Sequence, residues 1–414
     1  MRPIFAIIAG SATFALSPTA PSAAATVKTL FNFNTRQGAE PYGKMILDAK
    51  GDLYGDLSVG GKITAKNPYP AGAVFRIAPP AGTKGWIQTV LCAFKGGTDG
   101  AEPTGGLLAD SASNLYGTTF LGGAGGDGTV FKLFKPTTGK RAWTKRILHS
   151  FTGPDGAQPF AGLIGDAKGN LYGVTTSGGQ FNQGAVFEVT AKTFTESVLY
   201  SFQGPEGSTP YGGLAIDSAG NLFGTASTTS AAPYAGSAFK LSPPAAGQSS
   251  WNFTLLHAFK GGADGGSPQG AMVANTSGTI YGATFGGTGM GDGTVFELSP
   301  SAHSATGYSY QVIFTFNGAE GSNPFGDLAL DTTGKLWGPL LNSNDVNSSG
   351  GLFVLSPPTG GAGTWLQYAS YLFNGTTGGY SPYAGLVLDS AGNGYGTDFT
   401  GGAFDVGTIY KFIP

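Results

Sequence analysis

One unit is repeated seven times along the sequence, and this repetition limits the chain to architectures built from stacked copies. The unit reads Pro-x-Gly/Ala-x-Leu/Met-x-x-Asp-x-x-Gly-Asn-Leu-Tyr-Gly, and its clearest copy runs from Pro210 to Gly224. The copies begin at Pro41, Pro103, Pro159, Pro210, Pro268, Pro324 and Pro382, with spacings of 62, 56, 51, 58, 56 and 58 residues. A unit of this size cannot bury its hydrophobic face alone, so neighbouring copies must cover one another.

Each full copy contains four strand-like runs, which in the second copy cover residues 107–110, 114–119, 128–133 and 143–151. The Asp-x-x-Gly-Asn segment between the first two runs is typical of a tight turn, because Asp caps the turn backbone and Gly accepts a positive φ. With 72 Gly, 25 Pro and 12% aromatic residues in 414, the composition indicates short strands and turns rather than disorder. Four antiparallel strands in each of seven copies predict an all-β fold, a seven-bladed β-propeller.

The two ends of the repeat region predict how the ring closes. The seventh copy reaches Pro414 after its third run, at residues 407–412, and a spare fourth run lies at residues 27–33. We expect this N-terminal segment to pair with the last strand and complete blade seven, which would remove an exposed sheet edge. The alternative architecture is an open β-solenoid, which needs no such extra strand.

Residues 1–25 have the features of a secretory signal peptide. Arg2 supplies the positive charge, residues 4–16 form an apolar segment shorter than a membrane span, and residues 23–25 form a small-residue cleavage site. We therefore expect residues 26–414 to form one exported, monomeric propeller domain, secreted to the periplasm or the cell exterior without a membrane anchor. Cys92 is the only cysteine, so no intrachain disulfide can support the ring.

The repeat also carries a family resemblance. Residues 212–225 read Gly-Gly-Leu-Ala-Ile-Asp-Ser-Ala-Gly-Asn-Leu-Phe-Gly-Thr, and residues 293–298 read Gly-Thr-Val-Phe-Glu-Leu. Over residues 27–414 the chain resembles the GloVer tandem repeat of exported bacterial proteins, which have varied C-terminal anchors. The resemblance implies export and supplies no catalytic residues. This sequence departs from it in lacking a recognisable anchor, which favours release over surface attachment.

The loop that leads into the first strand of each copy, here called the leading loop, is the candidate ligand site. Its pattern is acid-Gly-x-x-Pro-aromatic, with acids at Asp99, Asp155, Glu206, Asp264 and Glu320 and aromatic residues at Tyr42, Phe160, Tyr211, Phe325 and Tyr383. By analogy with other propellers these loops emerge on one rim, where aromatic faces beside carboxylates suit sugar rings. The alternative is structural, with the acids capping turns and the aromatic rings wedged between blades.

Charged residues that depart from the repeat suggest an enzymatic alternative. Lys44 and Asp327 precede the first strand where most copies have a small residue, and Asp56 and Asp398 replace residues that follow Tyr-Gly in blades one and seven. Asp56, Asp398 and Lys44 together could perform acid–base chemistry on a glycosidic bond or a uronic acid. The first strands otherwise carry apolar residues, and a channel lined by them is a poor place for charged intermediates.

The remaining polar residues favour no metal or cofactor. His149 and His257 share a repeat position that Phe, Tyr or Cys occupies elsewhere, which indicates packing, and the turn acids such as Asp110 have the spacing of caps. No His-x-x-x-His or phosphate-loop motif occurs. A net charge of -2 argues against nucleic-acid binding, which depends on basic excess.

These features predict a secreted, non-catalytic binding or surface-interaction module. Extracellular glycan is the ligand class that the leading loops favour. The alternatives are an extracellular polysaccharide lyase or glycoside hydrolase that uses the three charged residues above, and a structural repeat protein whose partner is another protein.

Overall fold

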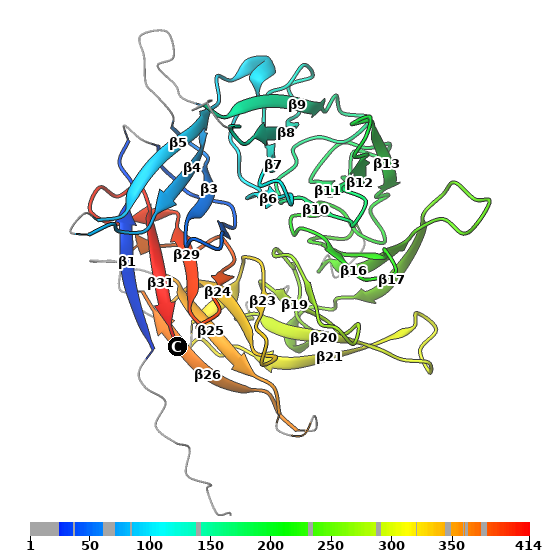
Figure 1. Cartoon of the computed structure of the whole chain (residues 1–414). Coiled ribbons are helices and arrows are strands. Elements are labelled where there is room, and N and C mark those ends of the chain that lie inside the picture. Colours follow the sequence, from blue (N-terminus) through cyan, green and yellow to red (C-terminus); the bar gives the residue numbers. More distant parts are fainter. Residues whose placement is uncertain are drawn as a thin grey trace, which may run out of the picture.

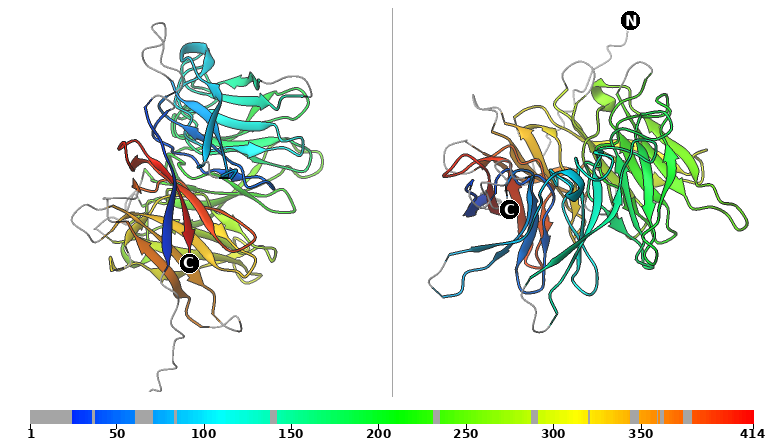
Figure 2. Two further views of the ribbon diagram at one scale, coloured as in Figure 1. Left: turned by 60° about the vertical axis from the view of Figure 1, so that its left-hand side comes forward. Right: turned by 90° about the horizontal axis from the view of Figure 1, so that it is seen from above.

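The computed structural model describes residues 25–35, 38–60, 71–82, 85–137, 142–230, 235–286, 291–319, 321–343, 349–358, 360, 363–373 and 379–414. The signal-peptide prediction therefore falls almost entirely outside the described residues. Within them, seven antiparallel sheets surround a central axis, as Figures 1 and 2 show. The seven-bladed propeller predicted from the repeat is confirmed.

Blades one to four follow the order of the sequence from the axis outward. Blade one contains β2 (Ile46–Leu47), β3 (Leu53–Leu57), β4 (Ala73–Ala78) and β5 (Ile87–Ala93); blade two β6 (Leu108–Ala109), β7 (Leu115–Thr119), β8 (Thr129–Phe134) and β9 (Thr144–Ser150); blade three β10 (Ile164–Gly165), β11 (Leu171–Thr175), β12 (Ala185–Val189) and β13 (Glu196–Ser201); and blade four β14 (Ala215–Ile216), β15 (Leu222–Ala226), β16 (Ser237–Ser242) and β17 (Asn252–Ala258). Short 3₁₀ turns η1 (Gly97–Asp99) and η2 (Gly262–Asp264) lie in two leading loops.

Blade five keeps this order, blade six has one additional short strand, and blade seven takes its outermost strand from the N-terminal segment. Blade five contains β18 (Val273–Ala274), β19 (Ile280–Thr284), β20 (Thr294–Pro300) and β21 (Tyr308–Thr315); blade six β23 (Ala329–Leu330), β24 (Leu336–Asn342), β25 (Gly351–Ser356) and β26 (Leu366–Leu372), with β22 (Ser322–Pro324) also on β24; and blade seven β28 (Val387–Leu388), β29 (Gly394–Asp398), β31 (Thr408–Ile413) and β1 (Thr26–Asn32). Beside blade seven, β27 (Gly379–Tyr380) pairs with β30 (Thr400–Gly401).

Blade seven joins the two ends of the described chain. Strand β1 pairs antiparallel with β31, from Thr26 opposite Ile413 to Asn32 opposite Thr408. In Figure 1 the blue β1 lies along the red β31 at the outer edge of that blade. The N–H of Phe33 donates to the carbonyl of Gly407 at 3.1 Å, which continues the junction. The predicted closure by the N-terminal segment is confirmed.

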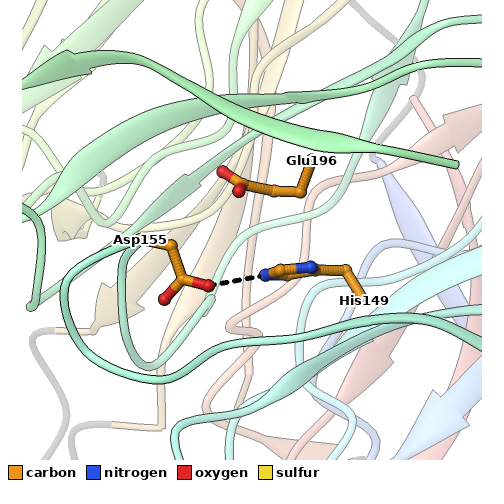
Figure 3. Close-up of side chains that lie close together, drawn as sticks. All are labelled: His149, Asp155 and Glu196. Carbon is orange, nitrogen blue, oxygen red and sulfur yellow. Dashed lines mark hydrogen bonds and ion pairs between the residues drawn. The ribbon is translucent and has the colours of Figure 1, made fainter.

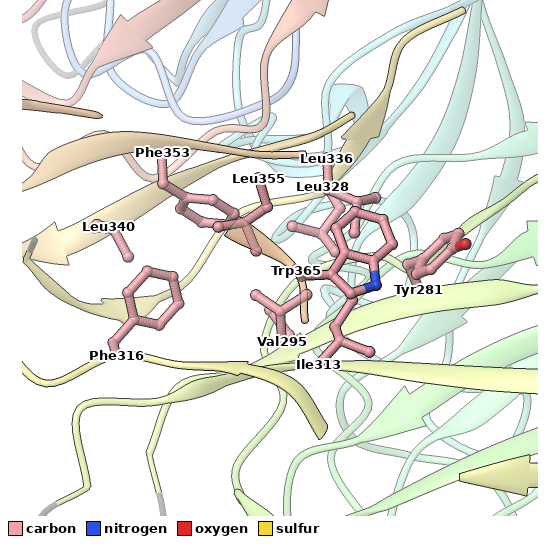
Figure 4. Packing of buried hydrophobic residues seen from close by; sticks show 11 residues of the cluster. Tyr281, Val295, Ile313, Phe316, Leu328, Leu336, Leu340, Phe353, Leu355 and Trp365 are labelled. Atoms are coloured by element: carbon pink, nitrogen blue, oxygen red, sulfur yellow. The ribbon is translucent and has the colours of Figure 1, made fainter. Parts of the chain in front are cut away.

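The hydrophobic core lies between blades rather than within one of them. Seven clusters of buried side chains each combine residues of two adjacent blades. In the cluster of Figure 4, Tyr281 and Val295 of blade five meet Leu336, Phe353 and Trp365 of blade six. Each blade therefore depends on both neighbours for burial of its faces, and the ring must close for every face to be covered.

A glycine and an aromatic ring face each other across the second and third strands of every blade. The pairs are Gly55–Phe75, Gly117–Phe131, Gly173–Phe187, Gly224–Phe239, Gly282–Phe296, Gly338–Phe353 and Gly396–Tyr410. Each ring is fully buried and lies where a Cβ of the opposing glycine would be. The Gly of Leu-Tyr-Gly is thus required by close approach of the ring.

Replacing Gly117 by Ala is expected to lower the free energy of unfolding by about 1–3 kcal/mol, the usual effect of overpacking a core. The added Cβ would lie 2.6 Å from Cζ of Phe131. Denaturant titration measures the loss, with Gly85→Ala as the control because a Cβ there meets no atom within 4 Å. Equal stability of the two variants would contradict this account of the repeat.

The Asp-x-x-Gly-Asn turns have the predicted capping geometry. In blade two, where Ser113 takes the place of Gly with a φ of 59°, Oδ1 of Asp110 accepts hydrogen bonds from the backbone N–H groups of Ala112 (3.0 Å) and Asn114 (2.8 Å). The hydroxyl of Tyr116 donates to Oδ2 of the same carboxylate at 3.1 Å. In blade five, Asn275 takes the place of Asp and accepts the corresponding backbone bonds. Cap and tyrosine therefore fix the turn at which the first strand reverses into the second.

The residue before each leading proline links neighbouring blades. It has a positive φ in all seven blades, at Glu40, Glu102, Gln158, Thr209, Ser267, Asn323 and Ser381. Its N–H donates to the preceding blade, as Gln158 does to the carbonyl of Asp127 at 2.7 Å, and the Gln158 carbonyl accepts from Thr176 of its own blade. Non-glycine residues in this conformation are strained, and the two hydrogen bonds hold the leading loop so that the next residues point to the axis.

Candidate functional site

The aromatic residues of five leading loops meet at the central axis. Their rings form a continuous series, Tyr211–Phe160–Tyr42–Tyr383–Phe325, with centroid separations of 5.2, 5.1, 5.0 and 5.0 Å. The rings of Tyr42 and Tyr383 are stacked, and the other contacts are edge-to-face. All five side chains are half-buried. We call these five residues the axial aromatic cluster.

Two polar residues complete the ring of leading loops. Thr104 follows the proline of blade two and is small enough for the rings of blades one and three to meet across it. Gln269 holds the same position in blade five, between Tyr211 and Phe325, whose rings make no contact with each other within the described chain. Both polar residues line a cavity of about 40 Å³ together with the axial aromatic cluster. The five rings therefore form an arc rather than a closed circle, and Gln269 lies between its two ends.

The tyrosine hydroxyls of the cluster are free hydrogen-bonding groups. Among the described residues, the hydroxyls of Tyr42, Tyr211 and Tyr383 have no hydrogen-bond partner, and none of the three is shut off from the surface. Burial, and after it the nearby Tyr383 and Tyr211, raise the pKa of Tyr42. The hydroxyl is therefore neutral at physiological pH and can both donate and accept.

An apolar channel of about 420 Å³ continues along the axis from the aromatic cluster. Its wall consists of first-strand residues such as Ile46, Ile164 and Val273, and Lys44 and Asp327 lie where the channel meets the aromatic cavity. The carboxylate of Asp327 accepts a hydrogen bond from the N–H of Ala271 at 2.8 Å. The volume lies within the range of small-ligand pockets, about 300–1,000 Å³, and such pockets are mostly apolar with few polar groups.

The acids of the leading loops lie away from the aromatic cluster, at the turn that follows the fourth strand. Asp155 accepts from the backbone N–H of Thr152 (2.8 Å) and contacts His149 Nε2 (2.9 Å) of β9. The carboxylates of Asp99, Glu206 and Asp264 likewise accept backbone N–H bonds from Lys95, Gln203 and Lys260. Glu320 lies outside the described residues. The structure therefore brings the five aromatic residues together, whereas the four described acids cap turns at the outer strands.

The three residues of the enzymatic alternative are not arranged as a catalytic group. Asp56 is 1% exposed, and its two oxygens accept from the N–H groups of Gly43 (3.0 Å) and Gly106 (2.8 Å), which links blades one and two. Asp398 is fully buried and accepts from the hydroxyl of Thr408 at 2.7 Å. Lys44 lies on the axial channel, and no hydrogen bond or ion pair joins these three described side chains.

Burial changes the acidity of both carboxylates. Desolvation raises the pKa of Asp56 to about 7, although the N–H groups of Gly106 and Gly43 oppose the shift. Desolvation also raises the pKa of Asp398 to about 8, against the hydrogen bond from Thr408. Asp56 and Asp398 occupy successive positions after Tyr-Gly, so their side chains point to opposite faces of their strands. They form two separate structural environments rather than an acid–base pair.

A further polar cluster, absent from the sequence-based candidates, joins blades two and three. Figure 3 shows Glu196 from β13 above the His149–Asp155 pair. The ligating atoms of the three side chains lie within 4.8 Å of one another. His149 also packs edge-to-face on Phe151 at 4.8 Å, as its repeat position suggested. Neither Gln269 nor Glu196 was among the sequence-based candidates. Each differs in chemical type from most residues at its repeat position, and this difference is visible when the position is compared across all seven copies.

Comparison with known proteins supports the repeat assignment. The family profile described as the Gloeobacter/Verrucomicrobia repeat matches residues 10–234 and 214–414. A search of the curated proteins gives no match. In the described part of the chain, no helix has the length and apolar character needed to cross a bilayer.

Two solved structures share the fold at low sequence identity. PorZ, an essential bacterial surface component of the type-IX secretion system of Porphyromonas gingivalis, has 14% identity and a TM-score of 0.53 over 91% of this chain and 47% of its own. The chain thus spans about half the length of PorZ. A candidate 6-phosphogluconolactonase from Bacteroides uniformis has 16% identity and a TM-score of 0.52 over 83% of this chain and 95% of its own. Both likenesses concern the fold alone.

Proposed function

The chain belongs to the Gloeobacter/Verrucomicrobia repeat family, and from this premise we propose that it is an exported, monomeric, non-catalytic propeller that binds extracellular glycan at its axial aromatic cluster. The single observation that carries the proposal is the convergence of five half-buried rings from five different blades on one axis. Rings that served only to pack between adjacent blades would not need to contact rings from non-adjacent blades. Tyr42 of blade one and Phe160 of blade three make such a contact.

The chemistry of the cluster matches that of a sugar. Aromatic faces stack on the apolar C–H faces of sugar rings, while sugar hydroxyls need hydrogen-bond donors and acceptors nearby. The free hydroxyls of Tyr42, Tyr211 and Tyr383 and the amide of Gln269 supply those groups on the same cavity. The cavity of about 40 Å³ is too small to enclose a sugar, so the ligand would lie across the cluster with the end of one residue inserted.

The positions of the acids favour binding over catalysis. Hydrolysis of a glycosidic bond usually needs two carboxyl groups on either side of that bond, about 5–10 Å apart. Asp56 and Asp398 are both shut off from solvent, and the described leading-loop acids cap turns at the outer strands. Asp327 is the carboxylate beside the aromatic cluster, and it is bound to the backbone of the neighbouring blade.

Tyr211→Ala and Tyr383→Ala are expected to weaken glycan binding at least tenfold each, which corresponds to about 1.4 kcal/mol. The first measurement is a glycan array with the intact protein, followed by titration of the best-bound oligosaccharide with each variant. Tyr368→Ala is the matched control, because Tyr368 is 43% exposed on the outer strand β26, away from the axis.

Three outcomes would contradict the proposal. Binding that is equally weakened by Tyr368→Ala would place the ligand elsewhere. Release of reducing ends or unsaturated sugars would favour the lyase or hydrolase alternative. A lack of glycan binding together with a protein that co-purifies in fixed ratio would favour the role of a structural repeat protein.

A further inference from the structure

One position on the outer strand of each blade faces the preceding blade, and its occupants differ in an informative way. It lies opposite the same repeat position of the third strand in every blade, as Glu196 lies opposite Val189. The seven occupants are Gln88, Lys145, Glu196, Phe253, Tyr310, Gln367 and Val27. We call this position the outer junction. Lys145 and Glu196 are its two charged occupants.

The neighbours of the outer junction are known at three other interfaces between blades. At blades one and two, Lys145 forms an ion pair with Asp99 at 2.8 Å. At blades three and four, Phe253 stacks on Tyr200 at 4.3 Å. At blades four and five, Tyr310 stacks on His257 at 3.5 Å and its hydroxyl donates to the carbonyl of Asp264. Each of these contacts is favourable without an additional ion or ligand.

At blades two and three the same position brings a second carboxylate close to the His149–Asp155 pair. Glu196 faces Asp155, a second carboxylate, and His149. Oε1 of Glu196 is buried and has no hydrogen-bond partner among the described residues. A cation bound between the two carboxylates would offset their mutual repulsion.

The two oxygens of Asp155 face different groups, and Oδ2 is the one directed to His149. Its Oδ1 accepts from the N–H and the hydroxyl of Thr152, at 2.8 and 3.0 Å, and this fixes the carboxylate on the turn. Its Oδ2 points to His149 Nε2 at 2.9 Å. One imidazole nitrogen and two carboxylate oxygens are thus directed to the same space from two blades, as Figure 3 shows.

We propose that His149, Asp155 and Glu196 bind a divalent transition-metal ion of the Zn²⁺ type, which links the outer strands of blades two and three. Nitrogen and oxygen ligands of this set suit Zn²⁺ at about 2.0–2.2 Å, with water in a fourth position. Such a geometry places ligand atoms about 3.3 Å apart. From separations within 4.8 Å, Glu196 would rotate inward, and the 2.9 Å separation of His149 Nε2 and Asp155 Oδ2 would widen by a few tenths of an ångström.

The interface between blades four and five is an internal control. His257 and Asp264 repeat the first two ligands, with Nε2 to carboxylate distances of 3.2 and 3.0 Å. Tyr310 replaces the third ligand there and covers the imidazole ring. The same chain therefore holds one His–Asp pair with a third carboxylate and one without it, and we assign metal binding to the first pair alone.

The test is titration of the protein, purified without a polyhistidine tag and freed of metal by chelation, with Zn²⁺ against a competing indicator. The wild-type protein is expected to bind one equivalent. Glu196→Gln and His149→Ala are expected to weaken this binding at least tenfold, and His257→Ala is expected to leave it unchanged. Glu196→Tyr reproduces the occupant of the outer junction at blade five, so this variant is expected to fold, to melt at the wild-type temperature or above without metal, and to lose Zn²⁺ binding.

X-ray absorption of the loaded protein separates this site from an ion held by Cys92. Nitrogen and oxygen neighbours at about 2.0–2.2 Å support the site, whereas a sulfur neighbour at about 2.3 Å would overturn it. No binding by the wild-type protein, equal binding by Glu196→Tyr, or loss of binding in His257→Ala would each overturn it as well.

Discussion

A chain that lacks residues 1–33 is expected to lose its cooperative unfolding transition and most of its net stability. Removal of β1 takes away the pairing along β31 and leaves blade seven with three strands. It also exposes two core clusters, which Val27 and the fully buried Phe33 complete. Burial of one such side chain contributes about 1.5–3 kcal/mol, and a folded domain is stable by only about 5–15 kcal/mol.

Thermal unfolding followed by circular dichroism measures this effect, and a chain that begins at Ala25 is the matched control because it keeps β1. A synthetic peptide of residues 25–34 is expected to restore the transition of the shortened chain, since the edge of β31 is then open to pairing. The same peptide with Val27→Asp is expected to fail, because Val27 packs into the core between blades six and seven. A shortened chain that melts within a few degrees of the control would show that strand β1 does not hold the ring.

The fold could be predicted because residues with the same structural roles recur in seven copies of the repeat. A Gly opposite an aromatic ring, an Asp or Asn that caps a turn and a proline after a strained residue recur in each copy, so the number of copies gives the number of blades. The extra run at residues 27–33 and the missing fourth run before Pro414 then predicted the closure. Such patterns can be recognised in the sequence because the residues that form each of them lie within a single copy of the repeat.

The candidate site was less predictable because residues that are close together in a leading loop can lie at very different distances from the propeller axis. Asp155 and Phe160 are five residues apart, yet Asp155 caps the turn after the outermost strand and Phe160 contacts rings at the axis. Likewise, Asp56 and Asp398 follow Tyr-Gly by one and two residues, and this difference of one places them on opposite strand faces. Glu196 approaches His149 only through the register of two separate blades, which no single copy of the repeat contains.

Replacement of Asp398 by Thr is expected to stabilise the protein, with the largest effect above pH 8. Asp398 is fully buried, and its Oδ1 has no hydrogen-bond partner among the described residues. In blade two the same position is Thr119, which shares a hydrogen bond of 2.8 Å with Thr129 across the strands. The introduced threonine would form that pair with Thr408, the residue opposite Asp398 on β31, without a buried charge.

The sign of the pH dependence follows from the raised pKa. Burial moves the pKa of Asp398 from 3.8 to about 8, so between these values the folded protein keeps a proton that the unfolded chain has released. The free energy of unfolding therefore falls as pH rises from about 4 to about 8, by up to about 1.4 kcal/mol per pH unit. Asp56 acts in the same direction, and its contribution ends near pH 7, to which burial raises its pKa.

Denaturant titrations from pH 4.5 to pH 9 measure the difference between Asp398→Thr and the wild-type protein. We expect a small difference at pH 4.5, a growing one up to pH 8, and a residual slope in the variant that ends near pH 7 because Asp56 remains. Asp110→Asn is the control of opposite sign. Burial alone would raise the pKa of Asp110, but hydrogen bonds from Asn114 outweigh it and hold that pKa below its usual value, so its removal should cost stability at every pH in this range. A difference between Asp398→Thr and wild type that does not change with pH would mean that Asp398 titrates normally despite its burial, and that the closing blade contains no protonated carboxyl group.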